Sequence, residues 1–389
     1  MGCPSGKISL PSQLQARALP NKKLQIAFGI DNAFTTTDIH WYKEFRRLSE
    51  SHLRMSTSQW RSVAKTARQI AIDGVRCHPG SISLSPLVQT LTLKISLHLF
   101  FGVDATTRTN DSNICFIAAE INRIWLASKQ QQQTQPWHTN PALHAALRAA
   151  IPDRDPLAPR ANPMNLILPS YETMWRVVLR CLVEVRFRPH AAAAPRWRSA
   201  LATFLADASP HVFNEEVVVP ADGQAVSAAA VAKEALRLYP PTRRVYRDLP
   251  PPVGGVAADV EALHRRSHGR SGGSSGRDSS AGAAHDLCTF RPERWVGGGT
   301  GDGDADVLGP FMAFGGARFL CPAGAAFGPM MVGVLVGALL EGLRVGEGEG
   351  EGQGEFEVEG RGYVGEMAGG EPLRSDREAY GDMRVVMRK

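Results

Sequence analysis

The sequence predicts a mainly α-helical protein with small β-sheets, organised as one large domain or two ordinary ones. Its 389 residues, 43% hydrophobic and 21% charged, are enough to bury a large core, which excludes a disordered chain and a small disulfide scaffold. Apolar residues recur at i, i+3 and i+4 spacing through much of residues 30–205. Short strand-like fragments follow the Pro240-Pro241 helix stop.

The helical pattern accounts for most of the chain before that stop. Apolar periodicity and terminal residues predict helices over 40–54, 58–75, 85–101, 114–129, 141–150, 162–188, 194–208 and 228–238. The fragment 244–246 is strand-like. We expect residues 1–25 to be a poorly ordered leader, and the folded domain to occupy 26–389. Low-complexity insertions, which cannot bury enough apolar surface to fold by themselves, lie at 130–133, 267–284, 297–303 and 346–354.

Residues 319–340 are uncharged and would pass a hydropathy test for a membrane span. Pro322 and Pro329 interrupt the first half of this run, which leaves 330–340 as uninterrupted helix, too short to cross a bilayer core. We therefore predict a buried helix after a functional loop. The first twenty residues contain no apolar segment of the kind that anchors or targets a chain to a membrane.

The six cysteines contain no CxxC pair or regular spacing, as is typical of a reducing compartment with one special thiol. The balance of 44 Lys+Arg and 38 Asp+Glu gives a net charge of +6, a mildly basic surface suited to an acidic partner. This balance does not establish a nucleic-acid binder, and we expect no nucleic-acid partner.

One of these cysteines, Cys321, lies in the glycine-rich segment 314–324, FGGARFLCPAG, directly before the apolar helix. Backbone N–H groups of such a loop and of the helix start can point at the sulfur and lower its pKa. Small residues allow a flat macrocycle to approach closely. Phe314, seven residues before the cysteine, can pack beside the sulfur and exclude water. This is the setting that a soft thiolate ligand requires.

The loop resembles the haem-binding loop of cytochrome P450 enzymes, in the FGxGRFxCPA form of filamentous fungi. The resemblance implies that Cys321 is the axial thiolate of a haem b iron, a ligand that favours O–O cleavage. It also implies that the cofactor contacts Phe314, Gly315, Gly316 and Arg318. Ala317 stands where the family usually has glycine, which affects the tightest part of the turn if that position requires a positive φ.

Two further motifs occur in the family's order. The pair Glu234 and Arg237, followed by Leu-Tyr-Pro-Pro, matches the family's ExxR helix, whose i, i+3 spacing puts both charges on one face. Residues 290–295, FRPERW, are identical to the family's FxPERW segment, and Arg294 would complete a structural triad with the first two. Residues 255–264 resemble the strand and ALHRDP segment that lie between these motifs.

The segment 165–178 stands where the family has the long helix that crosses the distal face of the haem. Glu172 and Thr173 match the acid–alcohol pair of that helix, which implies catalytic proton delivery through a water chain. Pro169 and Ser170 replace the family's small residues, so we expect a kink of different construction. The alternative is a plain amphipathic helix with Thr173 on its wet face.

Arginines can hold the haem propionates in bidentate fashion. Trp41 and Arg46 resemble the family's early helix that holds a propionate, and Arg244 and Arg318 are further candidates. His264 and His268 stand at i, i+4 and could ligate a metal, but no third ligand is nearby in the sequence. Cys321 itself could alternatively be a buried structural thiol or a weak haem-sensing cysteine.

The resemblance implies a monooxygenase that inserts one oxygen atom of O2 into a small apolar organic substrate, with NADPH electrons supplied by cytochrome P450 reductase. Leu166, Leu168 and Tyr171 would line the pocket. We expect a monomer of filamentous-fungal type that acts in secondary metabolism. The family suggests attachment to the endoplasmic reticulum membrane, whereas a complete chain without the anchor would be cytoplasmic.

Alternatives to this function follow from the start of the chain and from the chemistry of the thiolate. The family's anchor and first strands are missing from the chain as written, so we expect a P450 fold that is truncated at its N-terminus. An inactive, haem-binding remnant without enzymatic function is therefore one alternative. A peroxygenase or isomerase that uses the same haem-thiolate centre without a reductase shares all of the motifs.

Overall fold

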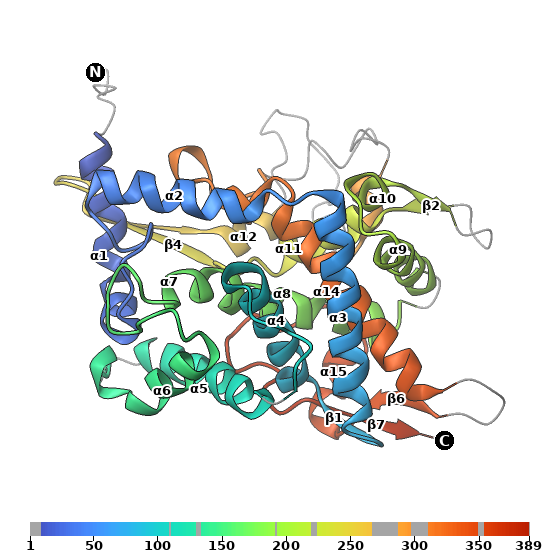
Figure 1. The fold of residues 1–389 in the computed structure, drawn as a ribbon. Coiled ribbons are helices and arrows are strands. Elements are labelled where there is room, and N and C mark those ends of the chain that lie inside the picture. The colour runs from blue at the N-terminus through green and yellow to red at the C-terminus, as the bar shows by residue number, and fades with distance from the viewer. Residues whose placement is uncertain are drawn as a thin grey trace, which may run out of the picture.

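The protein is described by a computed structural model that covers residues 9–108, 110–129, 134–190, 193–218, 224–266, 287–296, 310–348 and 354–388. It consists mainly of helices with three small antiparallel sheets (Figure 1), as the sequence predicts. The predicted insertions at 130–133, 267–284 and 297–303 lie outside the described residues, as does the centre of 346–354.

The helices of the described chain include those that match a predicted range within a few residues at each end and others that were not predicted. They are α1 (Leu10–Phe28), α2 (Ile39–Leu53), α3 (Thr57–Arg76), α4 (Leu84–Phe101), α5 (Asp111–Lys129), α6 (Pro141–Ala150), α7 (Met164–Ile167), α8 (Met174–Arg186), α9 (Ala194–Ala206), α10 (Pro210–Asn214), α11 (Ala228–Leu238), α12 (Val260–Arg265), α14 (Phe327–Glu347) and α15 (Val364–Met367). Apolar periodicity and terminal residues identified α2, α3, α4, α5, α6, α9 and α11. Helices α1, α10, α12 and α15 were not predicted.

The sheets are short and join distant parts of the chain. β1 (Ser81–Ser83) pairs with β7 (Arg384–Arg388), which also pairs with β6 (Glu355–Val358). β2 (Val217–Val218) pairs with β3 (Ala225–Val226). β4 (Arg244–Asp248) and β5 (Gly255–Asp259) form a hairpin in which Arg244 lies opposite Asp259. The predicted strand at 244–246 is confirmed and extends to residue 248.

Helix α1 corrects the expectation of a poorly ordered leader at 1–25 for residues 10–25, while residues 1–8 lie outside the described chain. Residues 10–28 are helical, and the side chain of Ser9 caps the helix by accepting a hydrogen bond from the Ser12 N–H. Leu14, Leu24 and Phe28 are buried, and the helix lies along β4. The burial of this apolar face against the rest of the molecule stabilises a segment whose own sequence pattern is weak.

Helix α14 lies at the centre of the core, beside α3, α8, α9 and α11 (Figure 1). It is longer than the predicted 330–340, because Pro329 lies in its first turn, where a missing N–H costs no helical hydrogen bond. Gly342 allows close packing, since a Cβ there would come within 3.0 Å of the Ala71 backbone of α3. Among the described helices, α4 and α14 are apolar and long enough to span a membrane, but both are mostly buried, as predicted for α14.

The predicted helix 162–188 is interrupted by a π-helical segment, η2 (Leu168–Glu172), between α7 and α8. Pro169 cannot donate a backbone hydrogen bond, so the helical hydrogen-bond pattern changes there. The Ser170 hydroxyl donates to the Leu166 carbonyl at 2.7 Å, and the Thr173 hydroxyl donates to the Pro169 carbonyl at 2.7 Å. These two hydroxyls satisfy carbonyls at the interruption, and the expected unusual kink is therefore a π-helical segment.

One face of η2, α8 and the residues that follow it carries a buried polar stripe, which we name the α8 stripe. Its members recur every four residues: Glu172, Arg176, Arg180, Glu184 and Arg188. Its arginines donate to backbone carbonyls of the C-terminal segment 371–377, to Arg377 at 2.8 Å, Arg374 at 2.8 Å, Asp376 at 2.9 Å and Glu371 at 2.7 Å. The stripe therefore fastens the C-terminal segment to the core.

Candidate functional site around Cys321

The loop before α14 is closed by its own backbone. Gly315 N–H donates to the Met312 carbonyl at 2.8 Å, and Cys321 N–H donates to the Phe314 carbonyl at 2.9 Å. Gly315 has φ +75°, so the residue that requires glycine is Gly315. Ala317 begins a 3-10 turn, Ala317–Phe319, and Tyr380 is the only non-glycine residue in the described chain with a positive φ. Alanine at 317 is therefore compatible with this turn.

The Cys321 sulfur lies half-buried just before α14. Burial raises the pKa of the thiol, while a hydrogen bond from the Ala323 N–H and the charges of Arg17 and Arg46 act in the opposite direction. A thiol in this position is held as a neutral group until a cation binds it, and coordination then removes its proton. The backbone donor at the sulfur is the feature that the sequence predicts for this loop.

Phe314 packs on the glycines that follow the cysteine. A Cβ at Gly324 or at Gly328 would lie 2.8 Å from its ring, so both positions must remain small for the ring to stay there. Gly316 lies against Met312, where a Cβ would approach the Met312 Cε within 3.0 Å. The loop, its aromatic residue and the first turn of α14 therefore form one packed unit.

Three guanidinium groups gather beside this unit, and we name them the arginine cluster: Arg17 of α1, Arg46 of α2 and Arg247 of β4. The Arg17 guanidinium stacks 4.7 Å from the Phe319 ring centre, and that of Arg247 lies 5.4 Å from the same ring. Burial and then the charge of Arg247 lower the pKa of Arg17 to about 10. Within the described residues, neither Arg17 nor Arg247 forms an ion pair with a carboxylate.

The sequence did not identify Arg17 or Arg247. Arg17 lies in the segment that was expected to be a leader. Arg247 could have been found by strand alternation, because residues 245 and 247 of β4 face inward while Arg244 faces outward. That alternation favours Arg247 over the predicted Arg244.

The four residues predicted to hold propionates lie in different settings. Trp41 donates from Nε1 to the Asp31 carbonyl at 2.8 Å and lies on α2, which contacts the Pro322–Gly324 turn. Arg46 binds Glu50 at 3.0 Å and acts electrostatically on Cys321. Arg244 pairs with Asp259 at 3.0 Å in solvent, and Arg318 is exposed. The structure places Trp41 and Arg46, both on α2, on the side of the cysteine loop.

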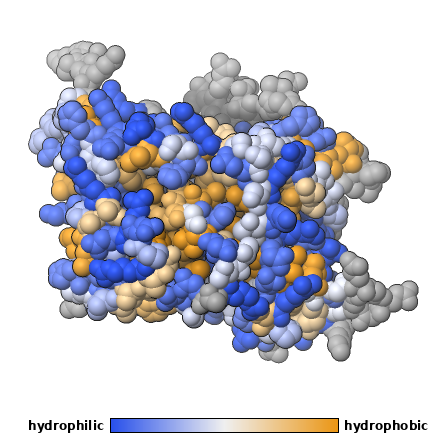
Figure 2. All heavy atoms as spheres, in the orientation of Figure 1, coloured by the Kyte–Doolittle hydropathy of each residue, from blue (hydrophilic) through white to orange (hydrophobic). Residues whose placement is uncertain are grey.

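The helix that the sequence places opposite the haem has one half-exposed face. Its residues follow helical spacing and are partly accessible: Leu166, Pro169, Ser170, Thr173 and Met174. Tyr171 is fully buried and donates to the Ala118 carbonyl, and Leu168 is also buried. Figure 2 shows hydrophobic side chains gathered across the middle of the molecular face between α2 and the helices α7 and α4. Of the predicted pocket residues, Leu166 alone lies on the half-exposed face.

Glu172 and Thr173 lie on different sides of this helix. Glu172 is fully buried, with Arg176 Nη2 2.9 Å from its carboxylate, Trp175 Nε1 at 3.2 Å, and Arg377 bound to the same carboxylate. Thr173, the next residue, is half-exposed, and its hydroxyl donates to the Pro169 carbonyl. The structure therefore does not bring the predicted acid–alcohol pair together on one face, and the Glu172 carboxylate is occupied by structural partners.

Glu234 joins the ExxR helix α11 to the FRPERW segment. Arg237 binds its carboxylate through Nη2 at 2.8 Å and Nε at 2.9 Å, and Arg294 Nε binds it at 3.0 Å. Trp295 Nε1 and the Arg291 N–H donate at 2.9 and 3.0 Å. The predicted triad of Glu234, Arg237 and Arg294 is thus one buried network.

Known structures resemble the whole described chain, although no family model and no curated protein matches it. A six-coordinated cytochrome P450 from Thermus thermophilus aligns at 16% identity with a TM-score of 0.56, over 96% of this chain and 87% of its own. CYP175A1 from another strain of T. thermophilus aligns at 15% identity with a TM-score of 0.58, over 97% and 88%. CYP154A1 from Streptomyces coelicolor aligns at 15% identity with a TM-score of 0.52, over 94% and 82%.

The chain has the cytochrome P450 fold. These identities establish the fold and nothing finer, so the predicted fold class is confirmed, while the fungal type and the truncation stay predictions.

The P450 fold implies a haem, and the residues around Cys321 fit that group. A single soft ligand stands at the start of α14 with a backbone donor on its sulfur. Two guanidinium groups beside it, Arg17 and Arg247, have no carboxylate partner in the described chain, and a haem brings two propionates. The half-exposed face of the η2 helix supplies an apolar surface with two hydroxyls, those of Ser170 and Thr173.

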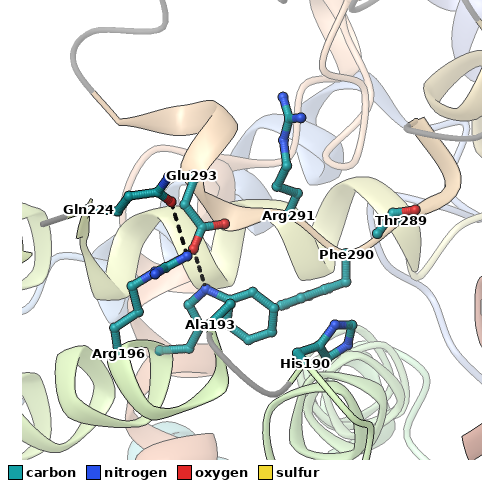
Figure 3. A pocket seen from close by; sticks show the side chains of 9 residues that line it. His190, Ala193, Arg196, Gln224, Thr289, Phe290, Arg291 and Glu293 are labelled. Carbon is teal, nitrogen blue, oxygen red and sulfur yellow. Dashed lines mark hydrogen bonds and ion pairs between the residues drawn. The ribbon is translucent and has the colours of Figure 1, made fainter. Parts of the chain in front are cut away.

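A separate pocket of about 340 Å³ lies between α9 and the FRPERW segment (Figure 3). Trp197, Phe290 and His190 are among its lining residues, and Glu293 accepts hydrogen bonds from Arg196 at 2.8 Å and from Trp197 at 2.7 Å. None of its lining residues belongs to the cysteine loop. The polar side chains at this pocket, such as Arg196 and Glu293, are hydrogen-bonded to one another.

Proposed function

We propose that the protein is a haem-thiolate monooxygenase that transfers one oxygen atom of O2 to a small apolar organic substrate, with electrons from an NADPH-dependent reductase. The observation that carries the proposal is the Cys321 loop, which offers one half-buried sulfur with a backbone donor and an adjacent arginine cluster. The P450 fold supports the same chemistry.

Each part of the site has a distinct task in this proposal. Cys321 would hold the haem iron, and Arg17, Arg46 and Arg247 would bind the propionates through charge-assisted hydrogen bonds. Phe314 would keep water from the sulfur. When bound, a haem with a thiolate ligand supplies the electron-rich iron needed to cleave dioxygen. Thr173 would present its hydroxyl to the distal side, while the predicted role of Glu172 in proton delivery stays a prediction.

The first test is the absorption spectrum of the reduced, carbon-monoxide-bound full chain after reconstitution with haem. We expect the red-shifted Soret band of thiolate ligation in the wild type and in Cys288→Ser, a cysteine of similar exposure outside the loop. Cys321→Ser should lose that band. Haem uptake with the same spectrum in Cys321→Ser would refute the ligand assignment, and no uptake by any form would support an inactive remnant.

A second candidate function is favoured by the position of Glu172. Because its carboxylate is bound by Arg176 and Arg377, the site has a hydroxyl at Thr173 without the neighbouring acid that reductase-driven oxygen activation would use. A peroxygenase or isomerase with the same thiolate does not need that acid. Turnover of a library of apolar substrates with NADPH and reductase, compared with hydrogen peroxide alone, separates the two functions.

The remaining assignments are part of the same proposal. A cytochrome P450 reductase is the proposed partner, since the mildly basic chain suits an acidic donor. We propose a monomer, attached to the endoplasmic reticulum membrane or cytoplasmic. Sedimentation and fractionation of the full chain would test both.

A further inference from the structure

His264 of α12 is 3% exposed and is bonded through both ring nitrogens. Its Nε2 lies 2.8 Å from the backbone nitrogen of Met312, and its Nδ1 lies 2.9 Å from the Arg237 carbonyl oxygen. A backbone N–H can only donate, so Nε2 is the acceptor. Nδ1 then carries the proton and donates to the carbonyl. The two partners therefore specify one neutral tautomer of the ring.

These bonds exclude His264 as a metal ligand, because both ring nitrogens are already engaged. His268, its predicted partner, lies outside the described residues. Within the described chain, no group of three or more histidine, cysteine, aspartate or glutamate side chains is arranged to hold a metal ion. The histidine must therefore serve the two elements that it joins.

The ring of His264 joins the Glu234 network to the start of the cysteine loop. Arg237, whose carbonyl accepts from the ring, also donates from Nη1 to the His264 carbonyl at 2.8 Å. On the other side, Met312 forms the first turn of the loop through the Gly315 N–H. Phe311 stacks on the imidazole with ring centres 5.8 Å apart and an interplanar angle of 9°.

We infer that His264 is a positioning residue for Cys321: its neutral ring holds Met312 in place, and protonation of the ring releases the turn that presents the sulfur. The inference rests on the proposed function in that Cys321 is taken as the haem ligand. A protonated Nε2 would face the Met312 N–H with a second donor, so the hydrogen bond could not form.

The charges around the ring set the direction of the pH effect. Burial lowers the pKa of His264 below its usual 6.5; Arg237 and Arg265 lower it further, while the bond to the Arg237 carbonyl and the charge of Glu234 act against them. Residues 310–316 of the loop carry no titratable side chain. Because the folded protein favours the neutral ring, this contribution to stability is complete above pH 6.5 and is lost as the pH falls towards the lower folded pKa.

The test measures the thiolate-type Soret band of the haem-loaded, carbon-monoxide-bound full chain as the pH is lowered from about 8 to about 5. We compare wild type with His264→Gln, whose side-chain carbonyl can accept from Met312 without titrating, and with His264→Phe, which offers no acceptor. The control is His98→Gln, since His98 also binds a backbone carbonyl, that of Val103, but forms no hydrogen bond with the loop in the described chain.

We expect the wild type and His98→Gln to lose the band with an apparent pKa below 6.5, and His264→Gln to retain it over the same range. His264→Phe should show a ratio of thiolate to non-thiolate species that is lower by about tenfold or more at every pH, because a buried N–H is left without a partner. The same acid transition in His264→Gln as in the wild type would overturn the inference, as would a wild-type band in His264→Phe.

A second measurement keeps the inference testable if His264→Phe does not fold or if no form binds haem. Amide hydrogen exchange of the peptide that contains Met312 is followed in the haem-free full chain and normalised to a peptide from α4. As the pH is lowered, the exchange rate of this peptide relative to that of the α4 peptide should rise in the wild type and not in His264→Gln. Equal exchange in the two proteins would overturn the inference, whereas a failure of haem binding alone would refute only the proposed function.

Discussion

Two buried carboxylates, Glu234 and Glu172, are built from the same chemistry and lie in different parts of the molecule. Each is 0% exposed, and each lies between two arginines with a tryptophan Nε1 as a further donor. The Glu234 network joins α11 to the FRPERW segment, whereas Glu172 joins the η2 helix to the C-terminal segment. A buried carboxylate held by two guanidinium groups is therefore a structural device that this fold uses twice.

The two carboxylates differ in how completely their arginines are enclosed. The side chains of Arg237 and Arg294 are 2% and 0% exposed, while that of Arg377 is 25% exposed and can turn towards water. Burial alone would raise the pKa of Glu234, but Arg237 and Arg294 outweigh it and lower the pKa. If the carboxylate is lost, the enclosed charges of Arg237 and Arg294 cannot turn towards water, whereas that of Arg377 in the Glu172 cluster can.

The largest effect is expected from Glu234→Gln. The substitution removes the negative charge that Arg237 and Arg294 share while both guanidinium groups stay buried, which should lower the free energy of unfolding by about 3–5 kcal/mol. Urea unfolding followed by circular dichroism measures it. The control Glu120→Gln breaks an exposed i, i+3 pair with Arg123 and should cost about 0.5 kcal/mol or less. Equal losses in the two variants would show that the network is not a stabilising unit.

Glu172→Gln should have a smaller effect, about 2–3 kcal/mol, since Arg377 can be solvated while Arg176 keeps a carbonyl partner. The same variant tests the predicted catalytic role. A structural carboxylate predicts reduced stability with turnover per folded molecule retained. Unchanged stability with turnover lost would instead show that Glu172 delivers protons and that its arginine partners are not structural.

The third prediction, an effect of intermediate size, concerns the packing of Phe314 in the cysteine loop. Gly328→Ala would place a methyl group 2.8 Å from the Phe314 ring, and the displaced ring should cost about 1–3 kcal/mol and weaken haem retention. Gly365→Ala in α15 meets no atom within 4 Å and should leave both unchanged or slightly improved. Thermal unfolding and haem-loss rates would record the difference. A harmless Gly328→Ala would mean that Phe314 does not depend on this packing.

The two carboxylates also differ in how far their partners could be predicted from the sequence. The Glu234 network was predictable because the two charges of ExxR lie one turn apart and FRPERW follows in a recognisable order. Arg377 was not predictable as a partner of Glu172, since 205 residues separate them and no motif marks the contact. The helix boundaries followed from local periodicity, but the ordering of α1 and the inward position of Arg17 depend on packing against β4. Local patterns therefore predict elements, while the site depends on contacts between distant ones.

The smallest effect on stability is expected for a substitution in the arginine cluster, which differs in this from both carboxylate networks. Arg237 and Arg377 have carboxylate partners, whereas Arg247 has none in the described chain and faces inward on β4. Arg247→Gln should therefore hardly change stability but should raise the haem dissociation constant about tenfold, the loss of one charge-assisted bond to a propionate. Arg244→Gln, on the outward face of the same strand, should leave haem binding unchanged because its guanidinium pairs with Asp259 in solvent. Haem titration of the two variants decides the matter, and equal dissociation constants would remove Arg247 from the site. An inward arginine that has no carboxylate partner in the described chain is then available for an anionic ligand, whereas Arg237 and Arg377 already hold the fold together.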